Sequence, residues 1–173
     1  MSDALTGVIR VIHIASAVAW VGGALLWGNV IAPRVMARGP PQIRRPFAEA
    51  VIPAMTRYYM IVGPLSILSG LVLIWRLYPT DYFSAFQVGG GYGPALAIGA
   101  LSAILMAIVG FGVIAPTGKK LLAAMGAAST PPTGEQQAEL GALGKRIGMM
   151  SMLVILFGTI AMFGMAWAVN AVR

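Results

Sequence analysis

Four long apolar stretches, separated by polar connections, constrain this chain more than any other feature. They run approximately over residues 5–32, 58–77, 94–115 and 147–169. A helix needs about 20 mostly apolar residues to cross the hydrocarbon core of a bilayer, and each stretch meets that length. Only 10% of the residues are charged, against about 25% in a soluble domain. We therefore expect an all-α integral membrane protein, a four-helix bundle built from two helical hairpins.

The connections carry signals for where these helices end. Pro33, Pro79 and Pro116 stand at three of the boundaries, and proline cannot continue a regular helix. In the first connection, residues 34–57, the segment P-F-A-E-A-V-I-P-A-M predicts a short interfacial helix. In the third, residues 117–146, S-T-P-P-T-G-E is typical of a helix N-cap. It predicts a polar helix that leads into the fourth span.

Charge predicts the orientation of the chain. Lys and Arg accumulate in cytoplasmic loops, and here they flank the first and third connections: Arg34, Arg38, Arg44, Arg45, Arg57, Lys119, Lys120, Lys145 and Arg146. The opposite side has only Arg10, Arg76 and Arg173. Both termini are therefore expected to face outward. The first residues, M-S-D-A-L-T-G, lack the basic leader and cleavage site of a signal peptide, so the first span is expected to be retained.

A short internal repeat suggests that the two hairpins are related. V-I-A-P ends the first span at residues 30–33 and recurs at residues 113–116. Basic residues, a P-P pair and an A-E segment follow each copy. The pattern is consistent with one transmembrane domain over residues 1–173 that contains a hairpin repeat, residues 1–80 and 90–173, although four identical letters also arise by chance. The histidine of the first span is not repeated, and the matching position lies near Leu96.

Composition excludes several classes of function. There is no cysteine, so disulfides and thiolate metal sites are impossible. One histidine excludes a bis-histidine site within a single chain. The net charge of +7 follows from membrane orientation and does not indicate nucleic-acid binding. Every carboxylate lies in a connection or at a span end, which argues against an ion-coupled transporter.

The single histidine, His13, lies about two turns inside the first span. On a helix it shares a face with Ser16, Ala17, Trp20, Gly23, Ala24 and Trp27. An ionisable side chain at that depth is costly, which makes it a candidate ligand for a cofactor. The alternative is a neutral imidazole that hydrogen-bonds to a backbone carbonyl or a serine and fixes helix packing. Trp20 is either a packing residue or one wall of a cofactor site.

Four further side chains are expected at the depth of His13. Arg10 and Arg76 lie near the outer ends of their spans and suit the propionates of a haem, or they extend to lipid phosphates. Met162 and Met165 share a face of the fourth span. Together with His13 they could ligate a haem iron or copper(I), or they fill gaps in helix packing.

Several of these residues carry a resemblance to a known group. The pattern H-x6-W-x2-G at His13, Trp20 and Gly23, followed by P-R at residues 33–34, resembles four-to-five-helix bacterial membrane proteins. These include the HemJ-type protoporphyrinogen oxidases and the membrane domain of copper resistance protein D. The run M-T-R-Y-Y-M-I-V-G-P, residues 55–64, extends the likeness over about the first 75 residues.

The resemblance implies a bacterial inner-membrane location and a haem b ligand role for His13. It does not extend to the HemJ-type reaction. The lysine that enters the third span of that family is absent, and the last span reads G-K-R-I-G-M-M-S-M in place of the family's N-E-x-P motif.

These observations predict a membrane protein that binds haem b through His13, with Arg10 and Arg76 at the propionates. Trp20, Met162 and Met165 are further candidates for the cofactor site. One alternative is a non-catalytic subunit of a larger respiratory or photosynthetic complex. Another is copper handling through His13 and the methionines. The expected partners are the lipid bilayer and either a larger membrane complex or further copies of this chain.

Overall fold

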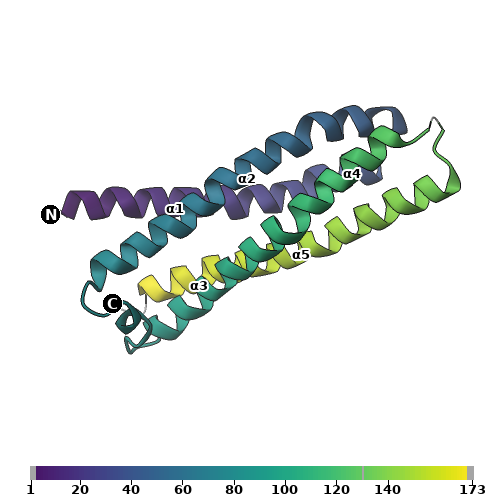
Figure 1. Ribbon diagram of the computed structural model, residues 1–173. Coiled ribbons are helices and arrows are strands. Elements are labelled where there is room, and N and C mark those ends of the chain that lie inside the picture. Colours follow the sequence, from purple (N-terminus) through teal and green to yellow (C-terminus); the bar gives the residue numbers. More distant parts are fainter. Residues whose placement is uncertain (1–2, 130, 171–173) are drawn as a thin grey trace.

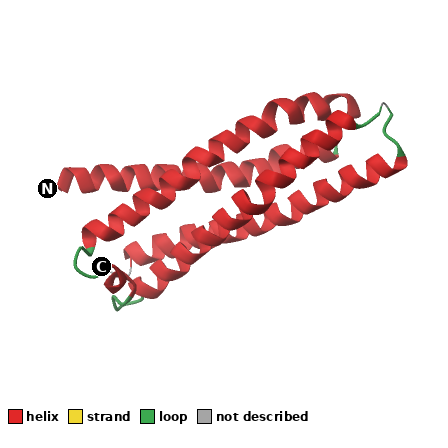
Figure 2. Cartoon of the chain, viewed as in Figure 1, coloured by secondary structure: helices red, strands yellow, loops and turns green. Residues whose placement is uncertain are grey.

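The computed structural model describes residues 3–129 and 131–170, so Arg173 of the charge pattern lies outside the described residues. The regular structure of this part is helical (Figure 2). In chain order the elements are α1 (Asp3–Leu26), η1 (Trp27–Ile31), η2 (Pro33–Ala37), α2 (Pro41–Leu77), η3 (Tyr82–Phe86), α3 (Tyr92–Val109), η4 (Gly110–Ile114), α4 (Ala115–Ala127) and α5 (Gly134–Asn170).

Among the described residues, four continuous helical segments are long and apolar enough to cross a membrane: Asp3–Met36, Gln42–Leu77, Tyr92–Ala127 and Gly134–Ala168. The all-helical fold with four such helices is therefore confirmed. The helix that starts the chain and the helix that ends it have their outer termini at the same end of the bundle (Figure 1).

Two of the three predicted proline boundaries are wrong. α2 ends at Leu77, two residues before Pro79, but the helical path continues past Pro33 and Pro116. A proline ring inside an α-helix clashes with the carbonyl four residues earlier. Here the turn before each proline widens to π-helical hydrogen bonding. The N–H of Ala32 donates to Trp27 O, and that of Ala115 donates to Gly110 O. The wider turn carries the helix through the proline instead of ending it.

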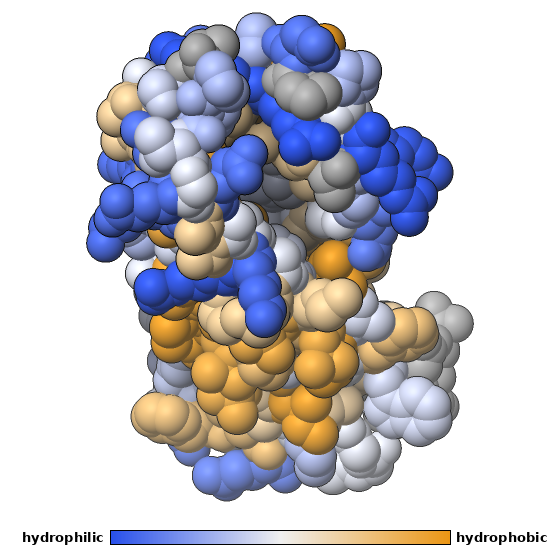
Figure 3. Space-filling model, turned by 90° about the vertical axis from the view of Figure 1, so that its right-hand side faces the viewer, coloured by the Kyte–Doolittle hydropathy of each residue, from blue (hydrophilic) through white to orange (hydrophobic). Residues whose placement is uncertain are grey.

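The first connection is shorter than predicted. The segment expected to form a separate interfacial helix is the beginning of α2, a single helix of 37 residues with Pro46, Pro53 and Pro64 inside it. At 1.5 Å per residue this helix is about 55 Å long, against about 30 Å for the bilayer core. The helix is therefore longer than a membrane crossing requires. Figure 3 shows hydrophilic residues gathered over the upper part of that view and an apolar surface below them.

The predicted N-cap of the last helix is confirmed. The N–H of Thr133 donates to Gln136 Oε1 (3.0 Å), and the N–H of Gln136 donates to Thr133 Oγ1 (3.3 Å). This reciprocal pair is a capping box. It starts α5, which continues without a break from the polar segment into the fourth apolar stretch.

The two hairpins pack against each other in the middle of the bundle. α1 pairs with α2, and α3 with its continuation α4 pairs with α5 (Figure 1). The central core consists of Trp20, Val21, Met106 and Val154. Gly158 lets α5 approach it, because a Cβ there would lie 3.1 Å from both Val21 Cγ1 and Met106 Sδ. A second buried cluster, Ala85, Ala95, Leu96 and Ala168, joins η3 to the outer ends of α3 and α5.

The two hairpins share a geometric register. In each hairpin a π-helical turn of five residues ends at the Ile of the V-I-A-P motif: Trp27–Ile31 in one and Gly110–Ile114 in the other. In each hairpin the returning helix has 37 residues. Descent from a duplicated hairpin stays a prediction, but both hairpins place their wide turn at the same point of the same motif.

Candidate functional site

The interface between α1 and α2 positions the candidate histidine. Of the face of α1 that carries His13, Ser16 and Trp20 are buried. Tyr58 of α2 holds the same face, since its hydroxyl donates to the carbonyl of Ala19 (2.7 Å). The face picked out by helical periodicity is therefore the face that packs, and His13 lies half-buried at its outer part.

Three residues of α2 surround the His13 ring. His13 Nδ1 lies 2.8 Å from the carbonyl oxygen of Ser66 and 3.4 Å from Ser69 Oγ. Gly70 lies against the ring, because a Cβ at that position would be 2.8 Å from Cε1. Ser66 and Ser69 are both buried. The imidazole is thus held between two helices in one orientation.

The Ser66 carbonyl determines the tautomer of the ring. A carbonyl oxygen only accepts hydrogen bonds, so His13 Nδ1 carries the hydrogen that it donates. In the neutral ring the lone pair is then on Nε2, which makes no hydrogen bond with the described residues. Metal-ligating histidines characteristically donate their other ring N–H to a carbonyl or carboxylate. His13 meets that condition within its own hairpin.

The two hairpins differ in what a glycine of the returning helix approaches. In the second hairpin Leu96 stands at the position of His13, and Gly164 of α5 approaches the backbone of α3. A Cβ at Gly164 would lie 2.9 Å from the Ala95 carbonyl oxygen. In the first hairpin, the close approach at Gly70 is to the imidazole of His13 and not to a backbone.

The two predicted arginines lie at the same end of the hairpin as His13. Arg76 Nε donates to Thr6 Oγ1 (3.1 Å), which joins the end of α2 to the beginning of α1. Arg10 is exposed on α1, one turn outward from His13. Its positive charge interacts electrostatically with the phenol of Tyr92 at the start of α3. One guanidinium from each helix is therefore available at the outer end.

The other predicted cofactor residues lie elsewhere. Met165 packs against Gly99 of α3, where its Cε is 3.3 Å from the Cβ position of the glycine. Met162 is 40% exposed. Trp20 is 5% exposed and stacks on Phe111 with ring centroids 6.1 Å apart. Met165 and Trp20 thus both make packing contacts between helices, and a role of either residue in a cofactor site stays a prediction.

The described residues do not form a cluster of protein metal ligands. No group of three or more His, Cys, Asp or Glu side chains comes together among them. Copper(I) held by His13 and the two methionines needs all three side chains at one point. Met165 packs against Gly99 of α3, and Met162 is 40% exposed, so copper binding by all three side chains stays a prediction. His13 therefore remains as a single nitrogen ligand.

Sequence reasoning missed the partners of His13 on α2. Ser66, Ser69 and Gly70 have the spacing i, i+3, i+4 and so share one helix face. Two serines and a glycine on one face of an apolar span indicate a polar contact with a neighbouring helix. Pairing the two spans antiparallel would have brought that face to His13.

Comparison with known proteins adds no assignment: no family model, no curated protein and no solved structure matches this chain.

Proposed function

We propose that this chain is an integral membrane protein that binds haem b, with His13 Nε2 as the axial ligand. The single observation that supports the proposal most is the orientation of the ring. Nδ1 is occupied by the Ser66 carbonyl and Nε2 is unpaired. Bound haem supplies one-electron redox chemistry at its iron, and the protein sets the ligand and the surroundings of that iron.

The residues beside His13 have separate roles in this proposal. The Ser66 carbonyl keeps Nδ1 protonated and fixes the plane of the ring, which strengthens Nε2 as a donor. Gly70 leaves the room that the imidazole occupies. Arg10 and Arg76 supply positive charge at the outer end for the propionates, and the bond of Arg76 to Thr6 holds its side chain near α1. The proposal assigns one protein ligand to the chain, His13, because Met165 packs against Gly99 of α3.

Absorption spectroscopy of the mildly solubilised protein tests this proposal. We expect a Soret band with about one haem per chain, and its loss in His13→Ala, which lacks the ligand. Gly70→Leu should also lose the band, because its side chain takes the space of the imidazole ring. Gly22→Leu is the matched control: a Cβ there meets nothing within 4 Å, so haem should be kept. A wild-type protein without a Soret band after haem addition, or an unchanged band in His13→Ala, contradicts the proposal.

A second candidate function is an accessory subunit of a larger membrane complex. The observation that favours it is a set of glycines within the spans whose Cβ positions meet nothing within 4 Å: Gly7, Gly22, Gly110, Gly112 and Gly148. Small residues on an outer helix face allow another helix to approach closely. This function predicts that larger subunits co-purify in mild detergent. Isolation as a haem-loaded monomer or homodimer argues against it.

A further inference from the structure

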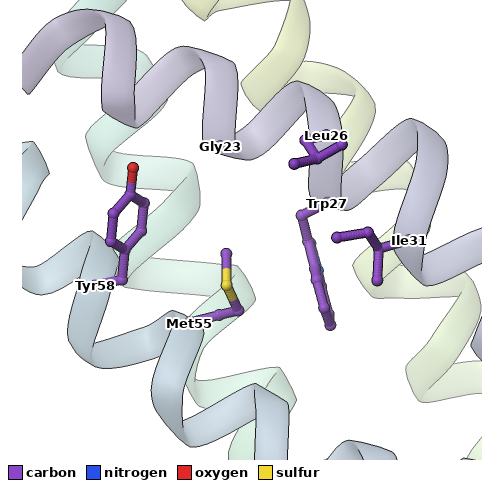
Figure 4. Close-up of a pocket in the computed structure, with 6 residues that line it drawn as sticks. All are labelled: Gly23, Leu26, Trp27, Ile31, Met55 and Tyr58. Atoms are coloured by element: carbon purple, nitrogen blue, oxygen red, sulfur yellow. The ribbon is translucent and has the colours of Figure 1, made fainter.

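A groove lies between α2 and the segment formed by α1 and η1, toward the end of the bundle opposite Arg10 and Arg76. It is lined by Gly23, Leu26, Trp27, Ile31, Met55 and Tyr58 and has a volume of about 210 Å³ (Figure 4). Sites for drug-sized ligands occupy roughly 300–1,000 Å³. The groove is therefore too small for a macrocycle such as haem, and its apolar lining suits a segment of a hydrocarbon chain.

The aromatic walls of the groove are held in place. The indole of Trp27 stacks on Phe47 of α2, with ring centroids 6.1 Å apart and planes within 4°. The hydroxyl of Tyr58 donates to the Ala19 carbonyl, so the polar end of that side chain is satisfied and its ring faces the groove. Met55 extends between these walls (Figure 4), and its flexible thioether can adapt to an irregular apolar chain. The groove therefore offers walls that are held in place and largely apolar.

Gly23 keeps the end of the groove near Tyr58 open. A Cβ at this position would lie 3.1 Å from Tyr58 Cε1, so a larger side chain would fill the space. The preceding residue, Gly22, is exposed and meets nothing within 4 Å of its Cβ position. Of these two adjacent glycines, only Gly23 lines the groove, so Gly22 is a matched control position.

A cation stands at the opposite end of the groove. Arg34 is exposed, and its Nη1 donates to the carbonyl of Val30 (3.2 Å). Arg34 follows the lining residue Ile31 by three positions on the same helical segment, about one turn further along. The chain has no acidic residue between Asp3 and Glu49, and Glu49 is itself paired with Arg45 (2.8 Å). The positive charge at this end is therefore not neutralised by a neighbouring carboxylate.

We propose that this groove binds one anionic phospholipid. An acyl chain lies against Trp27, Met55 and Tyr58, and Arg34 contacts the phosphate headgroup. On the orientation that the basic connections predict, the lipid belongs to the cytoplasmic leaflet. The site shares no residue with the proposed haem site, so either can fail without the other.

Native mass spectrometry from nanodiscs tests the lipid site. The nanodiscs contain equal amounts of phosphatidylglycerol and phosphatidylcholine with the same acyl chains. We expect one phosphatidylglycerol to remain on the released protein, retained at least several-fold over phosphatidylcholine. Arg34→Gln should remove that preference, whereas Lys145→Gln, an exposed cation on α5, should keep it. The same result is expected in His13→Ala, because the groove lies apart from that ring.

Variants that fill the groove distinguish a specific lipid site from non-specific lipid binding at the helix surface. Gly23→Leu should lose the retained lipid, and Gly22→Leu should keep it. Because Gly23→Leu also presses on Tyr58, Ile31→Trp provides a second way to fill the groove from its more accessible side. Equal retention of both lipids by the wild type overturns the proposal. So does a phosphatidylglycerol preference that survives Arg34→Gln or, in a folded protein, Ile31→Trp.

Discussion

At the scale of single residues, the polar groups of His13 and Tyr59 differ in burial and in hydrogen bonding. The His13 ring has one nitrogen paired and one unpaired, and it lies half-buried at the edge of the α1–α2 interface. The hydroxyl of Tyr59 is buried without a hydrogen-bond partner among the described residues, 3.4 Å from the Cβ position of Gly23. The first group can reach a ligand, whereas the second is enclosed by packing. Its neighbour Tyr58 is satisfied by the Ala19 carbonyl.

This difference predicts opposite effects of the same substitution at two adjacent tyrosines. Tyr59→Phe removes an unsatisfied buried hydroxyl and should raise the free energy of unfolding by about 1 kcal/mol. Tyr58→Phe removes the hydrogen bond from the Tyr58 hydroxyl to the Ala19 carbonyl, so it should lower that free energy by about 1 kcal/mol. Denaturant unfolding of both variants in one detergent measures the two effects. Destabilisation by Tyr59→Phe equal to that by Tyr58→Phe would count against this description of the interface.

At the scale of elements, hydrophobicity predicted the four long apolar helices but not where they end. The stretch from Arg34 to Arg57 contains charges and prolines, so it resembles a loop by composition. In the structure its larger part is the beginning of α2, and the prolines within that helix do not end it. Apolar content reports the lipid-facing segment, whereas a helix beyond the membrane is maintained by its own backbone bonds and by the neighbouring helices. The widened turns before Pro33 and Pro116 need tertiary information that local propensity does not contain.

The continuity of α2 has a direct consequence for backbone protection. Amides over residues 47–56 should exchange slowly with solvent, because each one after the first turn is bonded within the helix. The exposed glycines at positions 89–91, between η3 and α3, donate no amide hydrogen bond among the described residues; they should exchange much faster and serve as the internal reference. Hydrogen exchange with mass spectrometry compares the two in one sample. Equal exchange rates in both segments would support the loop that the composition suggested.

At the scale of the whole molecule, the sequence predicted the fold class and the face of α1 that packs, but only part of the site. The four apolar spans and the single histidine were readable because the bilayer imposes length and polarity. The methionines were placed at the depth of His13 by counting residues. Depth alone does not say which helix a side chain contacts, and Met165 contacts α3. The serines and glycine around His13 required the antiparallel pairing of α1 with α2.

The orientation of the bundle is testable because the chain has no cysteine. Gln87 lies after η3, in the connection predicted to face outward, and Gln137 lies in the first turns of α5 at the opposite end; both are exposed. A membrane-impermeant maleimide should label Gln87→Cys in intact cells, and Gln137→Cys only after the membrane is opened. The cysteine-free wild type is the control. Labelling of Gln137→Cys in intact cells would reverse the orientation.

The central claim is that His13 presents an unprotonated Nε2 because the Ser66 carbonyl holds the hydrogen on Nδ1. One histidine in the chain means that ¹⁵N NMR of a histidine-labelled sample contains the signals of a single ring. In haem-free protein at neutral pH we predict a protonated Nδ1 and a bare Nε2, and we predict that the free Nε2 signal disappears on addition of haem. A ring that is protonated on Nε2, or an Nε2 signal that haem leaves unchanged, would contradict the account.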